Sequence, residues 1–128
     1  MKHDVLSDVM SSIKNGDYVG KRETVAPASD LVKEVLHILQ KNNLIGDFEF
    51  IDDGRGGKFK IQLLGKINDC KVIKPRFSVR KDEYEKFERR FLPAAGFGFL
   101  IVSTPKGVLM HEEAKKKGLG GVLLGYVY

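Results

Sequence analysis

The chain has 128 residues, of which 42% are hydrophobic and 30% are charged, a balance typical of folded globular proteins and not of disordered ones. It has no apolar run of about 18 residues, so no membrane span is expected, and its first four residues lack the apolar stretch of a secretory signal. The net charge is +5, but residues 61–128 carry 13 basic and 7 acidic groups, whereas residues 1–60 carry 9 and 10. This basic second half suits a polyanionic partner, although a soluble protein that is merely basic would show the same charge.

Two helices are predicted in the first half of the chain. Residues 4–15 have apolar side chains at helical spacing, with Asp4 as the N-cap and Gly16 as a left-handed stop. The second helix opens at Pro27 and Ser29 and runs to about residue 42. His37 lies within its broad apolar stripe, so we expect the imidazole to be packed there.

Strand patterns surround and follow these helices. A short strand is expected at residues 23–26. Alternating apolar residues at 48–50 and 59–63 then flank the turn cluster Asp53-Gly54-Arg55-Gly56-Gly57, which predicts a β-hairpin. Residues 1–64 are therefore predicted to form an α-β-α-β-β unit.

Residues 65–128 are predicted to form a second, mainly β unit with short helices. Tyr84, Phe87 and Phe91 are expected to face inward from the first of these helices. The expected elements are strands at 70–73 and 76–79, a helix after Asp82 that Pro93 ends, a buried strand at 99–103, a turn at 105–107, a helical segment at 112–117 that Gly118 stops, and a strand at 122–128. The predicted fold class is α+β, with two small α/β units packed side by side.

The most distinctive local feature is Ser103-Thr104-Pro105-Lys106-Gly107, where a buried strand leaves the core. Its hydroxyls and backbone N–H groups are suited to phosphates, 2′-hydroxyls or base edges, and Lys106 adds positive charge. An ordinary turn would use the same residue types. Gly120-Gly121 allows a close backbone approach if it lies near this loop, which the sequence does not show. Lys115-Lys116-Lys117 could meet phosphates, but a solvated helix end that complements the helix dipole is the commoner explanation of such a run.

Catalysis, a cofactor and a metal are not expected. Ser103 and His111 are close in the chain, but no Gly-x-Ser-x-Gly motif or oriented base accompanies them. The three histidines have no metal-ligand spacing, and Gly54-Arg55-Gly56-Gly57 lacks the features of a phosphate-binding loop. Cys70 is the only cysteine and cannot form an internal disulfide, which indicates a reducing, cytoplasmic location.

Several motifs, in order and at matching spacing, resemble the ribosomal protein S8 family of the small subunit, in its archaeal and eukaryotic branch. They cover nearly the whole chain: Asp4-Val5-Leu6, Lys14-Asn15, Asp52-Asp53-Gly54-Arg55-Gly56-Gly57-Lys58, Pro75-Arg76-Phe77-Ser78-Val79, Phe91-Leu92-Pro93, Ser103-Thr104-Pro105-Lys106-Gly107, His111-Glu112-Glu113-Ala114, Gly120-Gly121 and Tyr126-Val127-Tyr128.

The resemblance implies a structural constituent of the small ribosomal subunit that binds directly to a central-domain hairpin of small-subunit rRNA and supports assembly. It implies that the main contacts come from the second unit: Ser103 and Thr104 contact bases and the sugar-phosphate backbone, while Pro105, Lys106 and Gly107 belong to the same loop. The remaining implied RNA-binding residues are Gly120 and Gly121 at the final turn, with Lys14, Asn15, Lys21 and Arg22 touching the backbone from the first unit.

The partners implied are small-subunit rRNA and neighbouring small-subunit ribosomal proteins, with no membrane. The alternative function is an RNA-binding translational regulator that acts on mRNA outside the ribosome, including its own mRNA. One departure from the family pattern is Met110, which stands where Thr or Asp usually precedes the short helix. We therefore expect this helix to lack a side-chain cap worth about 1 kcal/mol. Pro105 and Val122 replace a Ser and a Glu of bacterial members, which leaves any contact of those side chains in doubt.

Overall fold

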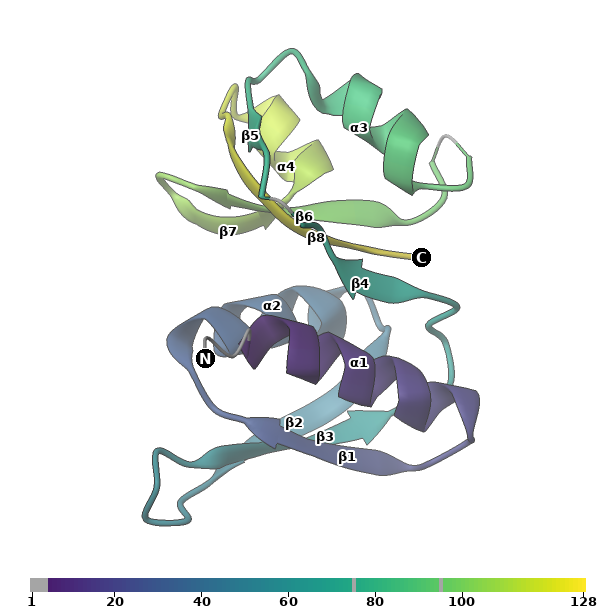
Figure 1. The fold of residues 1–128 in the computed structure, drawn as a ribbon, viewed down its shortest axis with the longest axis vertical. Helices are drawn as coiled ribbons and strands as arrows, with labels where there is room; N and C mark the ends of the chain where they lie inside the picture. Colours follow the sequence, from purple (N-terminus) through teal and green to yellow (C-terminus); the bar gives the residue numbers. More distant parts are fainter. Residues whose placement is uncertain (1–4, 75, 95) are drawn as a thin grey trace. The chain divides into compact units, whose positions relative to one another are not determined.

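The computed structural model describes residues 5–74, 76–94 and 96–128, which fall into two compact units, Met1–Asn68 and Asp69–Tyr128 (Figure 1). The sequence placed this division after residue 64. Asp17 accepts hydrogen bonds from the backbone N–H groups of Gly65 and Ile67, at 3.2 and 3.3 Å. These bonds hold the connecting segment to the first unit.

The first unit has the predicted α-β-α-β-β order. Two helices lie on one face of an antiparallel sheet with strand order β1-β3-β2 (Figure 1). Its elements are α1 (Val5–Tyr18), β1 (Glu23–Pro27), α2 (Asp30–Lys41), β2 (Ile45–Ile51) and β3 (Lys58–Leu63).

The two helices of this unit begin and end in part at the predicted residues. Ser29 is the N-cap of α2, because its hydroxyl accepts a hydrogen bond from the Val32 N–H at 3.2 Å. The prediction that the helix opens at Pro27 is wrong, because Pro27 pairs with Lys58 as the last residue of β1. The N-cap expected for α1, Asp4, lies outside the described residues. The prediction that Gly16 stops α1 is wrong: the helix continues to Tyr18, and the left-handed residue is Gly20. Gly16 is buried inside the helix, and a Cβ there would meet the Leu63 side chain of β3.

The second unit is an antiparallel sheet with strand order β4-β8-β6-β7, in which β5 also pairs with β8. Its elements are β4 (Cys70–Val72), β5 (Ser78–Val79), α3 (Tyr84–Phe91), β6 (Phe99–Thr104), β7 (Gly107–Met110), α4 (His111–Lys116) and β8 (Gly121–Val127). Both helices lie on the same side of this sheet (Figure 1).

The core of the second unit lies between the sheet and its helices. Tyr84 and Phe87 are buried, as predicted, whereas Phe91 is only half-buried. Leu100 and Val102 of the buried strand β6 pack in the same cluster. Gly118 has φ +66° and ends the last helix, as predicted. Strand β7 was not predicted, because its four residues follow the turn and directly precede α4, which leaves no alternating pattern to detect.

Candidate nucleic-acid interface

The turn that joins β6 to β7 is built around Thr104. Thr104 pairs with Gly107 across the hairpin, so Pro105 and Lys106 form its exposed tip. The Thr104 hydroxyl donates a hydrogen bond to the Gly107 carbonyl at 2.7 Å and accepts one from the Lys106 N–H at 3.1 Å. Thr104 is only 9% exposed. Its hydroxyl therefore fixes the shape of the turn from inside, which the sequence did not reveal.

Ser103 and Lys106 are the polar side chains that this turn leaves available. Ser103 is half-buried, between Val108 of β7 and Val122 of β8. Its hydroxyl has no hydrogen-bond partner among the described residues, and Lys106 has no ion-pair partner among them. One hydroxyl, one ammonium group and the rigid turn beneath them form a compact polar surface.

Gly121 lies beside the same turn, and Gly120 lies beside the end of β5. A Cβ on Gly121 would overlap the carbonyl of Ser103, and a Cβ on Gly120 would lie 2.5 Å from the carbonyl of Val79. Neither glycine has a positive φ. The close approach that requires both glycines is therefore between strands of the protein itself. Gly121 is therefore close to the Ser103–Gly107 turn, a proximity that the sequence alone did not show.

The other predicted site residues form a separate group in the first unit. Lys14 and Asn15 lie on the exposed face of α1, and Lys21 and Arg22 lie in the connection to β1. The backbone N–H of Lys21 bonds the carbonyl of Gly16 at 2.9 Å, which turns this connection back against the end of the helix.

Tyr18, which was not predicted as a site residue, lies beside this group and is 90% exposed. Its ring lies one helical turn after Lys14. The sequence could have indicated this exposure, because Tyr18 lies outside the apolar stripe of α1. An aromatic side chain at such a position cannot enter the core. Exposed aromatic rings beside basic residues are suited to stacking on unpaired bases.

His111, the sequence candidate for a base near Ser103, is fixed in the core. Its Nδ1 accepts a hydrogen bond from the Leu100 N–H at 2.9 Å, and its Nε2 lies 2.8 Å from Oε1 of Glu88. Both ring nitrogens are therefore engaged, so this imidazole is not oriented to activate Ser103. Burial lowers the pKa of His111 below 6.5, although Glu88 opposes the shift.

The helix that follows Met110 begins without a side-chain cap, as predicted. The run of lysines at its end is mostly paired: Lys115 lies 2.9 Å from Glu88 and Lys117 lies 3.5 Å from Glu113. These pairs favour the interpretation of this run as a solvated helix end.

The sequence of the chain matches a known protein family. The model of the family "Ribosomal protein S8" matches residues 4–128. This chain belongs to the ribosomal protein S8 family. Members of this family are structural, non-enzymatic proteins of the small ribosomal subunit that bind rRNA and contact other ribosomal proteins. The turn with Ser103 and Lys106 is therefore a candidate rRNA contact.

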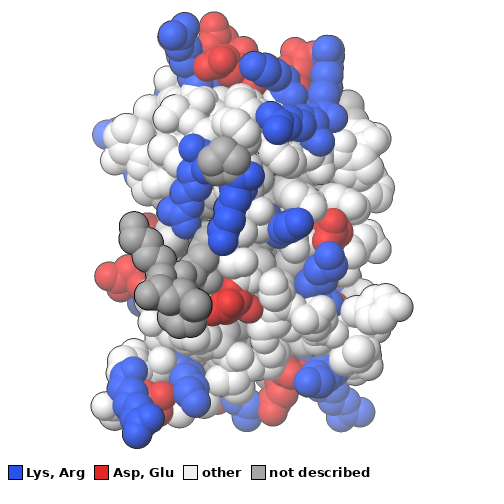
Figure 2. Space-filling model, in the orientation of Figure 1, with Lys and Arg blue, Asp and Glu red and all other residues white. Residues whose placement is uncertain are grey.

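Figure 2 shows the charged side chains on one face of the molecule. On the face drawn in Figure 2, Lys and Arg side chains are spread over the surface with Asp and Glu among them. Individual cations without acidic partners therefore indicate phosphate contacts better than the net charge does. Within the described ranges, no helix has the length and hydropathy to cross a bilayer, and no group of His, Cys, Asp or Glu is arranged to hold a metal ion.

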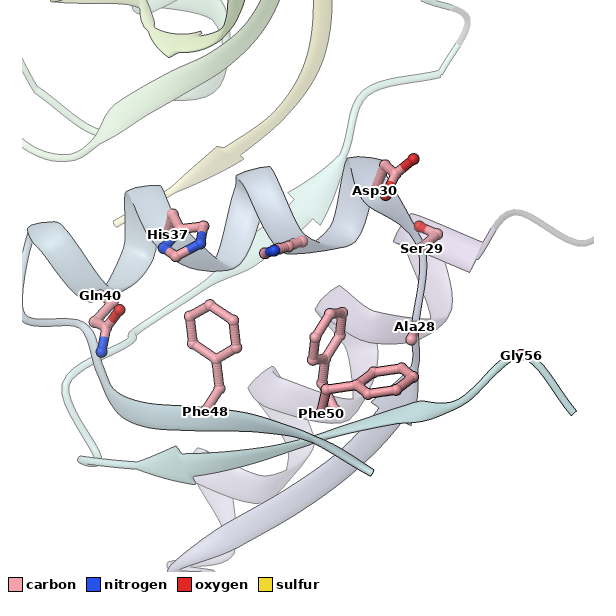
Figure 3. A pocket seen from close by; sticks show the side chains of 10 residues that line it. Ala28, Ser29, Asp30, His37, Gln40, Phe48, Phe50 and Gly56 are labelled. Atoms are coloured by element: carbon pink, nitrogen blue, oxygen red, sulfur yellow. The ribbon is translucent and has the colours of Figure 1, made fainter. Parts of the chain in front are cut away.

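The first unit of the protein contains a cavity of about 470 Å³ between α2 and the β2–β3 hairpin (Figure 3). Phe48 and Phe50 rise into it from β2, and His37 faces them from α2. The expectation that His37 is packed inside the helix stripe is wrong: the residue is exposed, with its ring 5.1 Å from the ring of Phe48. His37 follows the buried Leu36 and lies outside the buried face of α2.

Proposed function

We propose that this chain is a structural constituent of the cytoplasmic small ribosomal subunit that binds a central-domain hairpin of small-subunit rRNA and supports assembly of the subunit. Membership of the S8 family supports rRNA binding. The observation that carries the choice of surface is the hairpin turn of the second unit, where Ser103 and Lys106 stand on a rigid base without partners among the described residues.

The two units contribute differently in this proposal. The second unit supplies specificity, because a fixed hydroxyl beside unpaired bases can discriminate between hydrogen-bond donors and acceptors. The first unit supplies backbone contacts through Lys14, Asn15, Lys21 and Arg22, whose exposed side chains suit phosphates and sugars. The motifs Asp52–Lys58 and Phe91–Pro93 support membership of the archaeal and eukaryotic branch of the family.

Footprinting of the protein on total small-subunit rRNA tests this proposal. We expect protection of backbone and base positions within one irregular hairpin of the central domain. Protection confined to another domain, or spread without preference, would contradict the assignment. Co-sedimentation with small subunits after a high-salt wash distinguishes a subunit constituent from the alternative, a regulator that binds an mRNA copy of the hairpin.

A further inference from the structure

The guanidinium group of Arg90 is held against two aromatic rings of the second unit. Its Cζ lies 5.0 Å from the ring centroid of Phe77 and 5.3 Å from that of Phe91, while the residue as a whole is exposed. Cation–π contacts of this kind limit the rotation of an otherwise flexible side chain. The hydrogen-bond donors of Arg90 are therefore presented to solvent in a restricted orientation.

The rings beneath Arg90 are themselves fixed. Phe77 contacts the buried Phe87 with centroids 5.5 Å apart, and Phe91 stacks on Tyr126 at 5.9 Å with an interplanar angle of 18°. The hydroxyl of Tyr126 donates a hydrogen bond to Asp69 at 3.1 Å. Burial, with this bond to Asp69, raises the pKa of Tyr126 to about 12, so the donor stays protonated under ordinary conditions. Arg90 thus rests on a rigid aromatic support.

The carboxylates on α3 are engaged by other cations. Glu85 binds Arg89 at 2.7 Å. Glu88 binds His111 and Lys115 at 2.8 and 2.9 Å. Arg90 makes no ion pair with any described residue. The helix therefore carries a cation whose charge is not compensated nearby.

A second such cation lies on the same side of the helix. Lys86 is exposed one turn before Arg90, without an ion-pair partner in the described part of the chain, and its Nζ lies 5.6 Å from the Phe87 ring centroid. Two partially immobilised cations on aromatic rings therefore form a short stripe along α3.

We propose that Arg90, with Lys86, forms a second RNA contact that binds phosphates of the rRNA backbone, separate from the turn at residues 103–107. The planar guanidinium fork matches phosphate oxygens in a bidentate manner, and its support lowers the entropy lost on binding. RNA is favoured over an acidic protein segment because residues 69–128 carry 12 basic and 7 acidic groups and the family binds rRNA.

This inference rests on the proposed function, and salt-dependent binding of the full-length protein to the central-domain hairpin with its flanking helices tests it. We expect Arg90→Gln to weaken binding about three- to tenfold at low salt and to reduce the log–log salt slope by about 0.7–0.9, the value for one phosphate contact. Arg90→Lys keeps the charge but not the fork, and we expect an intermediate loss of affinity.

Arg89→Gln is the matched control, because it removes the same charge from the adjacent position, where the side chain is committed to Glu85. Its affinity should stay within about twofold of wild type, since the Arg89 side chain is paired with Glu85 and an exposed ion pair of this kind contributes little. Equal effects of Arg90→Gln and Arg89→Gln would overturn the inference and leave only nonspecific attraction.

Lys106→Ala, a variant of the candidate turn, distinguishes the failure of this inference from the failure of the proposed function. If Lys106→Ala weakens binding while Arg90→Gln has no effect, the hairpin is bound but α3 does not touch RNA, and an acidic protein partner becomes the occupant. If wild type shows no preference for the hairpin over unrelated RNA, the proposed function fails and this inference fails with it.

Directed cleavage supplies a positional test. The only native cysteine, Cys70, is buried, so an iron chelate can be attached selectively at Arg89→Cys. We expect cuts in the rRNA backbone from this position and none from wild type treated in the same way. A bound complex without cuts from Arg89→Cys would overturn the contact.

Discussion

The α-carbon of Gly121 lies directly against the carbonyl group of Ser103 in the neighbouring strand, which leaves no room for a side chain. This contact sets the position of Ser103 at the edge of the candidate RNA surface. It also means that large substitutions of Gly121 report on the fold of the protein before they report on RNA.

We therefore predict that Gly121→Ala lowers the free energy of unfolding by about 1–3 kcal/mol, because the added methyl group forces β6 and β8 apart. Chemical denaturation measures this loss. Val122→Ala, at the next and half-buried position of β8, should cost less than Gly121→Ala. A Gly121→Ala protein as stable as wild type would show that the strands have room to adjust.

We expect substitution of Ser103 to affect RNA binding and substitution of Thr104 to affect stability. Ser103→Ala should weaken binding to the central-domain hairpin by about 1–3 kcal/mol without changing stability, because its hydroxyl has no partner among the described residues. Thr104→Ala should lower the free energy of unfolding by about 1–2 kcal/mol, since it removes both hydrogen bonds inside the turn. Filter binding and chemical denaturation of each variant check both outcomes. Wild-type binding by Ser103→Ala would remove it from the site.

The basic residues of the first unit should contribute affinity without selectivity. The double variant Lys21→Ala, Arg22→Ala should weaken binding to the matched hairpin and to an unrelated hairpin by similar factors, because contacts to phosphates carry no sequence information. Competition binding with both RNAs measures the two factors. Lys33→Ala with Lys41→Ala, which removes two exposed charges from α2, is the matched control. A selective loss of the matched RNA would contradict this division between the units.

Stability should fall in mild acid because of His111. Its pKa is lowered in the folded protein, chiefly by burial, whereas in the unfolded chain it titrates near 6.5. As the pH falls through 6.5, the unfolded chain therefore takes up a proton that the folded protein does not. The contribution of His111 to stability is complete above this range and decreases below it, by at most about 1.4 kcal/mol per pH unit.

Denaturation at pH 7.5 and pH 5.5 measures this dependence on pH. The loss of stability should be smaller in His111→Gln than in wild type, whatever the absolute stability of the variant. His37→Gln, which replaces an exposed histidine, should keep the wild-type dependence. The same dependence in all three proteins would exclude His111 as the titrating group.

Local patterns in the sequence predicted much of the fold. The helical spacing of Leu6, Val9 and Ile13, the Ser29 cap, the left-handed Gly118 and the Pro105-Lys106 turn all act within a few residues. Interactions of such short range leave a direct signal in the order of residue types. The motifs of the candidate turn and of the S8 family are likewise runs of neighbouring residues, so the sequence alone showed them.

The tertiary structure decided what depends on residues far apart in the chain. Gly16 lies inside its helix, where Leu63 of β3 occupies the space that a side chain would need. Thr104 turns inward, whereas Ser103 stays available, because strands on both sides hold their backbone. Arg90 lies over the ring of Phe77, which is distant from it in the chain, and no residue spacing in the sequence indicates this contact. The sequence by itself determined the local elements, because these are set by neighbouring residues. It also indicated the family, because the family motifs occur in order along the chain. The position of the Ser103 hydroxyl and that of the Arg90 guanidinium were decided by packing between distant segments, which no local pattern records.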